Sequence, residues 1–510
     1  MFAVYNINIT LQPKRGKIKS RTILFFIFLE SPALFEHEND TIAAICTGTG
    51  GAVGIIRISG PRALDAIRSV WRGRRMPGPE CPRAMLYGHI VSGQEGAGAG
   101  EPSLAVFMPG PNSFTGEDVA ELHCHGGSFA ARRALRLVLQ AGARLAQNGE
   151  FTRRAFLNGK LDLTQAEGVL DLINAGSERA GLLAERQLNG AVGSVVREIR
   201  AEVVRLLAEC ESRLDFSEED LDWMPPDELR GRIAALREQA ADLAATARAG
   251  SLIRDGVSLV IAGPPNAGKS SLLNRMLGYD RAIVTPIPGT TRDTLEESVS
   301  IGGISFRVTD TAGLREAEEA DPVEAIGMER SQQSLGTADI VLWLLDASAP
   351  AESFPAQFIA MNRAESTVRG KFIPCWNKMD GAAVPSDELD RACSAKTTGD
   401  NEASNPVFEH ISVLTGDGLD NLFRRLEENA WDGLPPTAQS GDAVVSERHA
   451  VLLEQAANHL DAACECVQAE SWELAGSSLR TAAELIGCIT GETATPDVLD
   501  EIFSRFCIGK

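Results

Sequence analysis

The 510-residue sequence lacks several features that would place it in large classes of protein. No apolar run reaches the roughly 18 residues that a membrane-spanning helix needs, which argues against a membrane protein. The 10 cysteines are scattered, with one CxC pair at Cys464 and Cys466 and nothing at zinc-finger spacing. Free thiols in a reducing compartment are therefore expected. There is also no internal repeat, which excludes a repeat architecture.

Positive charge is scarce as well. The chain has 49 lysines and arginines against 70 aspartates and glutamates, a net charge of −21. The surface as a whole must repel nucleic acid. If RNA is a substrate, contact requires a local basic patch or a partner protein.

Residues 1–39 differ from the rest of the chain. Five basic residues between Lys14 and Arg21 precede a short apolar run, Ile23–Leu29, which Glu30 interrupts. This order is faintly similar to a signal peptide, but the apolar stretch is short. A disordered extension, or a start codon assigned too early, is the favoured interpretation, and a cytoplasmic location is expected.

The length predicts two to four domains, and 44% apolar residues suffice for real cores. Residues 40–155 have the pattern of a small α+β domain. Helices are expected at Pro61–Val70 and Ser128–Gln140, with a glycine-rich loop at Gly93–Pro102. Strands are expected at Thr41–Cys46, Val53–Ser59, Met85–Val91, Leu104–Met108 and Val119–Cys124.

Residues 156–254 and 431–510 have helical periodicity. Apolar residues recur at spacings of three and four from Leu188 to Leu206, and the same pattern returns from Leu453 to Val467. Another helix is expected to begin near Asp227, after two prolines. The two helical parts suggest one bundle divided by an insertion.

The insertion, residues 255–430, alternates strands and helices, which predicts a mostly parallel sheet covered by helices. The expected strands are Val257–Ala262, Ser305–Thr309, Ile340–Asp346, Lys371–Trp376 and Glu409–Val413. The fold class is thus multidomain: an α+β N-terminal domain, an α-helical bundle domain, and an inserted α/β domain.

The segment Gly263–Ser270 fits the phosphate-binding pattern GxxxxGK[ST] and lies between a predicted strand and a predicted helix. Backbone N–H groups of such a loop cradle phosphates. Lys269 would reach the β- and γ-phosphates, and Ser270 would ligate Mg²⁺. A chance glycine-rich turn is the alternative.

Two further motifs follow in the order that a switch requires. Gly289–Asp293 (GTTRD) places Thr291 to ligate Mg²⁺ only when a triphosphate is bound, and Asp310–Gly313 (DTAG) follows the next predicted strand. The residue after this motif is Leu314, where Ras-type enzymes have a water-orienting glutamine. The chain must therefore orient its water by another route.

The motif Asn377–Asp380 (NKMD) ends a predicted strand. A carboxylate at Asp380 can accept hydrogen bonds from guanine N1–H and its 2-amino group, which adenine cannot offer. In register with the other motifs, it predicts a guanine-nucleotide-hydrolysing enzyme and makes the insertion an α/β P-loop GTPase domain. His123-Cys124-His125 also suggests a metal site, but no further ligand cluster lies nearby in sequence, so ordinary residues at a strand end are the favoured interpretation.

The flanking sequences resemble one family of GTPases. Asn112–Asp118 (NSFTGED), Arg154–Leu163 (RAFLNGKLDL) and the terminal Phe506–Lys510 (FCIGK) are similar to the tRNA modification GTPases of the MnmE (TrmE) family, from about Asp40 to Lys510. The resemblance implies an N-terminal folate-binding and dimerising domain, a helical domain and an inserted G domain. The implied bounds are 40–155, then 156–254 with 431–510, and 255–430.

The resemblance also implies an activity and partners. With the FAD protein MnmG, as a homodimer within a heterotetramer, the family modifies C5 of the wobble uridine, position 34, of certain tRNAs. It adds an aminomethyl or carboxymethylaminomethyl group and uses a one-carbon unit of 5,10-methylene-tetrahydrofolate, of which 5-formyl-tetrahydrofolate is an analogue. GTP, Mg²⁺ and K⁺ are the other expected cofactors.

Residue roles follow by motif. The resemblance implies a folate site at Arg57, Glu121, Lys160 and Lys510, modification chemistry at Cys507, and a water-orienting Glu324 that acts with Lys269 and Asn266. Potassium is assigned to Asn266, Thr285, Ile287 and Thr290, and Mg²⁺ to Ser270 and Thr291. The expected nucleotide contacts are Asn266, Ala267, Gly268, Lys269, Ser270, Ser271, Thr285, Pro286, Ile287, Pro288, Gly289, Thr290, Thr291, Asp310, Thr311, Ala312, Gly313, Asn377, Lys378, Asp380, Ser412, Val413 and Leu414.

Two departures from the family pattern affect these expectations. The last guanine motif is Ser412-Val413-Leu414 in place of a Ser-Ala-Lys type, and the loop Thr47–Gly51 is shorter than the common version. Two other function classes stay open on sequence alone. One is a regulatory GTPase of ribosome assembly, and the other is a structural dimerisation protein with a vestigial G domain.

Overall fold

The structure, a computed structural model, describes residues 40–48, 50–92, 100–215, 223–279, 296–310, 335–382, 384–386, 388–390, 407–432 and 443–510. The chain forms two compact units. The first consists of Met1–Leu170, Arg186–Ala244 and Arg448–Lys510, and the second of Asp171–Glu185 and Ala245–Glu447. Within the described residues, no helix has both the length and the apolar character needed to cross a membrane.

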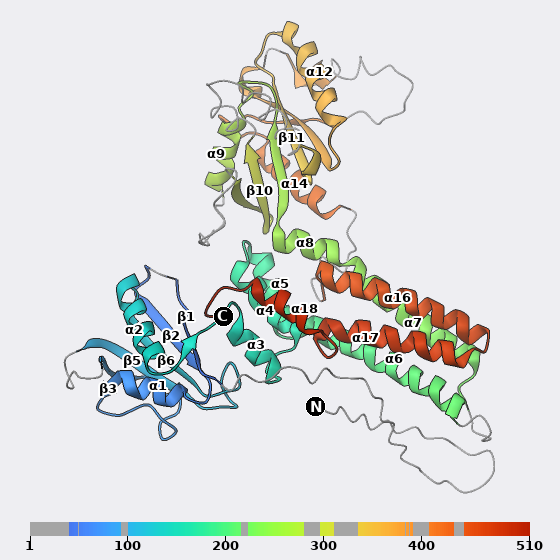
Figure 1. The fold of residues 1–510 in the computed structure, drawn as a ribbon. Helices are drawn as coiled ribbons and strands as arrows, with labels where there is room; N and C mark the ends of the chain where they lie inside the picture. The colour runs from blue at the N-terminus through green and yellow to red at the C-terminus, as the bar shows by residue number, and fades with distance from the viewer. Residues whose placement is uncertain are drawn as a thin grey trace, which may run out of the picture. The chain divides into compact units, whose positions relative to one another are not determined.

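The first unit begins with a seven-stranded sheet in the order β3-β4-β5-β6-β2-β1-β7 (Figure 1). All neighbouring strands are antiparallel except β1 and β7. The strands are β1 Ile42–Ile45, β2 Val53–Ser59, β3 Trp71–Gly73, β4 Leu86–Ile90, β5 Glu101–Met108, β6 Val119–His125 and β7 Arg144–Leu145.

Two helices, α1 (Ala63–Val70) and α2 (Ser128–Gln140), pack on one face of this sheet. Their buried side chains share one apolar core with inward-facing residues of the strands, such as Ile56, Phe107 and Leu122. The short strands β3 and β7 were not predicted, because two or three residues give no periodicity. Strand β5 begins at Glu101, inside the stretch expected to be a loop.

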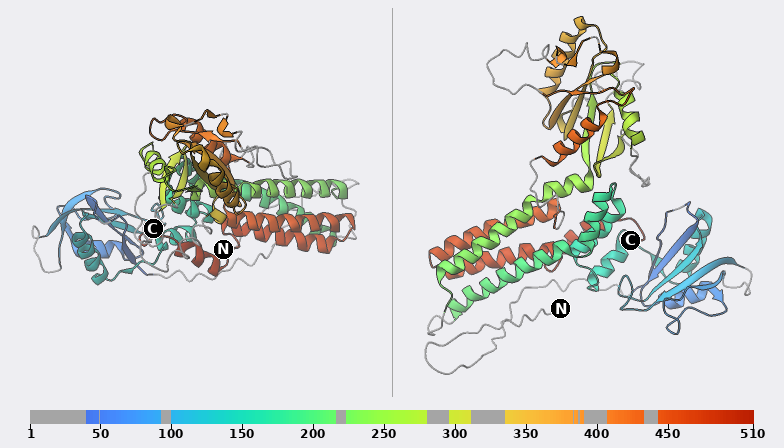
Figure 2. Two further views of the ribbon diagram at one scale, coloured as in Figure 1. Left: turned by 90° about the horizontal axis from the view of Figure 1, so that it is seen from above. Right: turned by 180° about the vertical axis from the view of Figure 1, so that it is seen from behind.

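The remainder of the first unit is helical. Helices α6 and α17 pack along each other, and Figure 2 shows α6, α7, α16 and α17 side by side. The helices that lie wholly or partly in this unit are α3 Glu150–Leu157, α4 Leu163–Asn174, α5 Glu178–Leu188, α6 Ala191–Asp215, α7 Pro226–Ala245, α16 Glu447–Gln468, α17 Trp472–Thr490 and α18 Pro496–Ser504. The apolar run expected to begin at Leu188 is broken at Gly190, whose φ of +88° ends α5 before α6 starts.

The C-terminal tail returns to the sheet domain. Gly149 and Phe151 donate backbone hydrogen bonds to the carbonyls of Cys507 and Lys510, at 3.4 and 3.2 Å. A Cβ on Gly509 would lie 2.5 Å from the carbonyl oxygen of Ile45, so only glycine permits this approach. The last residues of the chain therefore lie beside the end of β1.

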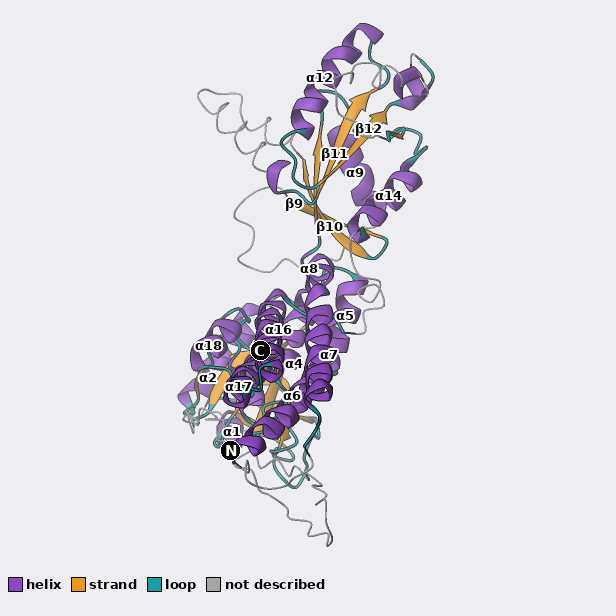
Figure 3. Cartoon of the chain, turned by 90° about the vertical axis from the view of Figure 1, so that its right-hand side faces the viewer, coloured by secondary structure: helices purple, strands orange, loops and turns teal. Residues whose placement is uncertain are grey.

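The second unit contains a six-stranded sheet in the order β13-β12-β11-β8-β10-β9 (Figure 3). All pairs are parallel except β9 with β10. Its strands are β8 Val257–Ala262, β9 Glu296–Ile301, β10 Ile304–Asp310, β11 Ile340–Asp346, β12 Lys371–Asn377 and β13 Glu409–His410. Its longer helices are α8 Ala247–Asp255, α9 Lys269–Tyr279, α12 Phe354–Glu365 and α14 Leu419–Trp431.

The mostly parallel sheet confirms the predicted α/β class of the insertion, and the fold class as a whole is confirmed. Strand β9 was not predicted; it forms a hairpin with β10 through Gly302 and Gly303, which both have positive φ. The strand expected at Glu409–Val413 ends at His410, because the chain turns back at Ser412, whose carbonyl accepts a hydrogen bond from Gly416 N–H at 2.8 Å.

Candidate functional sites

The phosphate-loop motif connects β8 to α9, as the sequence predicts. Three residues of the loop have positive φ: Gly263 at +143°, Asn266 at +64° and Gly268 at +95°. These angles turn the chain sharply so that α9 begins at Lys269. A Cβ on Gly263 would lie 2.3 Å from the carbonyl oxygen of Leu344 in β11, so the loop lies tightly on the sheet.

Lys269 is largely buried, with 9% of its surface exposed. Its ammonium group donates hydrogen bonds to the carbonyl oxygens of Gly263 and Pro264, at 3.1 and 3.0 Å. The charge therefore lies inside the curve of the loop, next to the N-terminus of α9. Both features favour an anion at this position.

Asn377 joins the loop to the guanine motif. Its side-chain amide donates to the carbonyl of Ala267 at 2.8 Å, and its side-chain carbonyl accepts from Val413 N–H at 3.1 Å. The residue is 1% exposed, so the amide acts inside the protein. Three segments that are far apart in sequence are thus held together by one side chain.

Asp380 lies at the exposed end of the same motif. The Ser412 hydroxyl donates a hydrogen bond to its carboxylate, and Met379 N–H bonds to the carbonyl of Ile411 at 3.2 Å. The first residue of the departing Ser-Val-Leu motif therefore orients the carboxylate. Leu414 projects outward with 80% of its surface exposed.

Lys378, between these two residues, has a left-handed backbone with φ +64°. Its ammonium bonds to Asp346 at the end of β11, at 2.8 Å. Burial alone would raise the pKa of Asp346, but the hydrogen bonds from Lys378 and Ser348 hold that pKa below its usual value. The pair fixes the ends of β11 and β12 next to each other.

Several predicted site residues lie outside the described residues. These are Thr285, Pro286, Ile287, Pro288, Gly289, Thr290, Thr291, Thr311, Ala312, Gly313, Leu314 and Glu324. For Asp310 the structure gives the backbone, which pairs with Ile261 two residues before the phosphate loop.

A second candidate site lies in the first unit, on the sheet face opposite α1 and α2. Arg57 of β2 and Glu121 of β6 are cross-strand partners, and the Arg57 Nε donates to the Glu121 carboxylate at 2.8 Å. His123, two residues along β6, contacts the other carboxylate oxygen at 3.1 Å. Burial alone would raise the pKa of Glu121, yet hydrogen bonds from His123 and Arg57 lower it.

Aromatic rings and a loop surround Arg57. Its guanidinium lies 5.4 Å from the ring centroid of Phe114 and 5.9 Å from that of Phe151. The loop that carries Phe114 also accepts a hydrogen bond from Lys160, whose ammonium lies 3.1 Å from the carbonyl of Pro111. Arg57 and Lys160 therefore border one loop, although they are 103 residues apart in sequence, and Glu121 is joined to them through its bond with Arg57.

The Cys46 thiol shows that Lys510 belongs to the same neighbourhood. Burial raises the pKa of Cys46, and the charges of Arg57, Glu121 and Lys510 all act on it. Sequence reasoning did not single out Cys46, because a lone cysteine after a strand belongs to no motif. Cys507, three residues before the C-terminus, is exposed.

Two of the motifs that carry the family resemblance are joined by an ion network around the buried Arg154. Arg154 contacts the carboxylates of Asp40, Glu117 and Glu150 at 2.6 to 3.2 Å. Burial opposes ionisation of Asp40, but the hydrogen bonds from Arg154 and Arg144 hold its pKa below the usual value. Arg154 therefore fixes the start of α3 to β1 and to the Phe114 loop.

Among the described residues, His123 and His125 are not part of a metal cluster. The part of the chain that the structure describes contains no group of three or more His, Cys, Asp or Glu that could hold a metal ion. His125 bonds to Glu101 at 3.1 Å, and His123 to Glu121.

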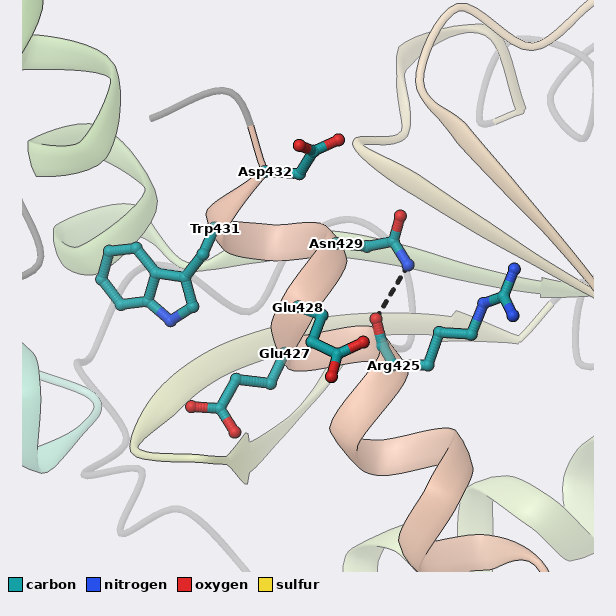
Figure 4. Close-up of a pocket in the computed structure, with 6 residues that line it drawn as sticks. All are labelled: Arg425, Glu427, Glu428, Asn429, Trp431 and Asp432. Carbon is teal, nitrogen blue, oxygen red and sulfur yellow. Dashed lines mark hydrogen bonds between the residues drawn. The ribbon is translucent and has the colours of Figure 1, made fainter. Parts of the chain in front are cut away.

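An open groove of about 630 Å³ runs along the end of α14, and Figure 4 shows its lining. It contains none of the predicted site residues.

Comparison with known proteins identifies the family. A family model described as MnmE helical domain matches residues 163–507, and one described as GTP-binding protein TrmE N-terminus matches residues 41–160. The tRNA modification GTPase MnmE of Symbiobacterium thermophilum is 42% identical over 477 residues, 92% of this chain and 99% of that protein. The protein of the same name from Roseiflexus sp. strain RS-1 gives the same identity and coverage.

Among solved structures, the G domain of the T. maritima FeoB iron transporter matches 34% of this chain and 98% of that chain, with 24% identity and a TM-score of 0.24. The family assignment thus rests on the sequence relatives, which cover nearly the whole chain. The chain belongs to the MnmE family of tRNA modification GTPases.

Proposed function

We propose that this chain hydrolyses GTP and, together with the FAD protein MnmG, modifies C5 of the wobble uridine of certain tRNAs. The product is an aminomethyl or carboxymethylaminomethyl derivative, and the carbon comes from 5,10-methylene-tetrahydrofolate. The observation that carries the GTP part is the Asn377 side chain, which links the phosphate loop to the guanine motif. The tRNA and folate parts are supported by family membership and by the Arg57–Glu121 pair.

The phosphate loop fits a nucleoside triphosphate. Lys269, held inside the loop, would bind the β- and γ-phosphates, and the Ser270 hydroxyl at the start of α9 is a suitable oxygen ligand for Mg²⁺. Bound Mg²⁺ supplies neutralisation of phosphate charge. Asp380, oriented by Ser412, would read the guanine, while Asn377 positions both ends of the site.

A monovalent cation would take the place of an arginine finger. Asn266 is exposed on the loop, and its side-chain carbonyl is a suitable oxygen ligand for a potassium ion. Thr285, Ile287 and Thr290 would complete that site, Thr291 would join Ser270 on Mg²⁺, and Glu324 would orient the water. GTP turnover in potassium against sodium at equal ionic strength, for wild type and Asn266→Ala, tests this part. Equal rates in the two salts would contradict it.

The folate site would use the opposite charges of the N-terminal domain. Glu121 is an acceptor for N–H donors of a pterin-like ring, and Arg57, Lys160 and Lys510 are cations for the carboxylates of a glutamate tail. Cys507, exposed on the tail that ends at Lys510, is the proposed residue of the modification chemistry. The proposed assembly is a homodimer within a heterotetramer, in the cytoplasm, with domain bounds at residues 40, 156, 255 and 431.

Analysis of wobble nucleosides tests the proposal as a whole. A strain that lacks the gene should lose the C5 modification, and the wild-type gene should restore it. Lys269→Ala should fail to restore it, whereas Lys371→Ala, a change of the same type at the start of β12, should succeed. A regulatory role in ribosome assembly would leave the wobble nucleosides intact in the deletion strain.

A further inference from the structure

The outer surface of α1, α2 and the segment after β3 is rich in arginine. Residues 61–76 and 128–142 contain eight arginines and a single acidic residue, Asp65. We call this surface the arginine face and define it by Arg62, Arg72, Arg74, Arg75, Arg132 and Arg136, which are all exposed. In a chain of net charge −21, such a concentration of positive charge is unusual.

Helix α2 directs its arginines away from the core. Ala131, Ala134 and Val138 are buried against the sheet, while Arg132 and Arg136 lie on the opposite side of the helix. Phe129, one turn before Arg132, is 76% exposed. The helix therefore presents two guanidinium groups and an aromatic ring in one row.

The other arginines lie at the two ends of α1, which covers the same sheet face. Arg62 precedes the helix, and its guanidinium contacts the carbonyl of Ala141 at the end of α2. Arg72 follows the helix and bonds back to the carbonyl of Arg68. Arg68 holds the next segment by donating to the carbonyl of Pro77 at 2.8 Å, so Arg74 and Arg75 lie beside this end of α1.

The positive charges of this face are not neutralised by neighbours. None of the six defining arginines forms an ion pair with a carboxylate in the part of the chain that the structure describes. The bonds of Arg62 and Arg72 are to backbone carbonyls, which leaves their charge uncompensated. Arg68 contacts Glu80 at 3.4 Å, but both side chains are exposed and such a pair contributes little.

We propose that the arginine face binds the phosphate backbone of tRNA, an inference that rests on the proposed function. Planar guanidinium groups bind phosphate oxygens through paired hydrogen bonds, and a row of them suits a polyanion. The exposed Phe129 ring suits an unstacked base or ribose beside that backbone. Because the rest of the surface is acidic, this face also orients the RNA toward the N-terminal domain.

Fluorescence anisotropy of a labelled tRNA that carries a wobble uridine tests the proposal with the full chain in 50–200 mM KCl. Arg132→Gln with Arg136→Gln should weaken binding about tenfold and reduce the slope of log affinity against log salt by about two, one per phosphate contact. Arg132→Lys with Arg136→Lys should keep most of the slope. Phe129→Ala should weaken binding without changing the slope, because the ring carries no charge.

The matched control is Arg363→Gln with Arg424→Gln, two exposed arginines on α12 and α14, which alters the net charge equally. The proposal is overturned if wild type binds no tRNA, if Arg132→Gln with Arg136→Gln binds like wild type, or if the control loses as much. Tight binding to vesicles of anionic lipid in place of tRNA would assign the face to a membrane and would also refute it.

Two further readouts separate this inference from the proposed function. The variant with both arginines of α2 replaced should retain GTP turnover and 5-formyl-tetrahydrofolate binding, because neither site contains these residues. If the deletion strain loses the wobble modification while the variant binds tRNA normally, only the arginine face is wrong. An intact wobble base in the deletion strain would reject the proposed function itself.

Discussion

The two candidate sites are built by opposite means. In the inserted domain, the site depends on backbone conformation: positive φ at Gly263, Asn266 and Gly268, and a buried amide at Asn377. In the N-terminal domain, charged side chains from separate strands define the site, as in the pair of Arg57 with Glu121. Nucleotide binding at the first site should therefore be sensitive to an added Cβ and insensitive to acid. Folate binding at the second site should be insensitive to an added Cβ and should depend on the charge of its side chains.

The largest expected effect is that of Gly268→Ala on GTP turnover. A Cβ at this position would lie 2.3 Å from the Asn377 amide nitrogen, at a backbone φ of +95° that disfavours any side chain. The loop would have to move, and the link between phosphate loop and guanine motif would break. We expect turnover at limiting GTP to fall by about 10³-fold, which corresponds to about 4 kcal/mol.

The control for this variant is Gly278→Ala, near the end of α9, where an added Cβ meets no atom within 4 Å. Alanine favours a helix over glycine, so this change should leave turnover intact. Folate binding should be unchanged in both variants. Wild-type turnover in Gly268→Ala would mean that backbone geometry does not define the site.

Asp380→Asn should have the second largest effect, on GTP affinity. Replacing the carboxylate removes the acceptor for the two guanine donors, so GTP affinity should fall by about 10²-fold while xanthosine nucleotides gain. The Ser412 hydroxyl can still bond to the amide, so the local fold should survive. Titration calorimetry with both nucleotides measures the change, and equal GTP affinity in variant and wild type would remove Asp380 from base recognition.

The difference between the two sites also explains how much of each can be predicted from the sequence. The phosphate loop is local: its glycines, Lys269 and the flanking strand and helix are adjacent in the chain, and the structure places them as expected. Strands β2, β8 and β11 and helix α2 have the predicted bounds for the same reason, because each has a clear periodicity of its own.

Features that depend on distant residues were not predictable from the residues alone. The paired residues are far apart in the chain: 64 residues separate Arg57 from Glu121, and 114 separate Arg154 from Asp40. Nothing in the local sequence around these residues indicates the pairing. The bond from Asn377 to Ala267 spans 110 residues. For Arg57 and Glu121 the resemblance to a family supplied what periodicity could not, whereas Cys46 and His123 emerged as neighbours of that site only in the structure.

Glu121→Gln should have the third largest effect, and only on folate. The change keeps the size of the side chain but removes the negative charge that Arg57 and His123 contact and that a pterin-like ring would require. Charged hydrogen bonds of this kind contribute about 2 kcal/mol, so affinity for 5-formyl-tetrahydrofolate should fall about 30-fold. GTP turnover serves as the internal control. Unchanged folate affinity would place the site elsewhere.

The smallest expected effect is a change in the pH dependence of folate binding, and it tests the charge-built character of this site directly. Glu121 is buried, which opposes its ionisation, but hydrogen bonds from His123 and Arg57 lower its pKa below the usual value of 4.5. A carboxylate with a depressed folded pKa contributes fully above pH 4.5 and loses its contribution as the pH falls through the folded value. In wild type, Glu121 should therefore stay ionised throughout the range from pH 7 to pH 5.

His123→Leu removes one of the two lowering hydrogen bonds and leaves the burial, so the pKa of Glu121 must rise. The carboxylate is then protonated at a higher pH than in wild type, so folate affinity should fall about twofold more between pH 7 and pH 5 than in wild type. His123→Gln keeps a donor at the same place and should stay closer to wild type. Comparing the three proteins cancels the titration of the folate itself. Parallel pH profiles in all three proteins would show that His123 does not act through Glu121. A steeper profile in His123→Leu alone, with nucleotide binding unaffected, would show that the contact at 3.1 Å keeps this carboxylate charged.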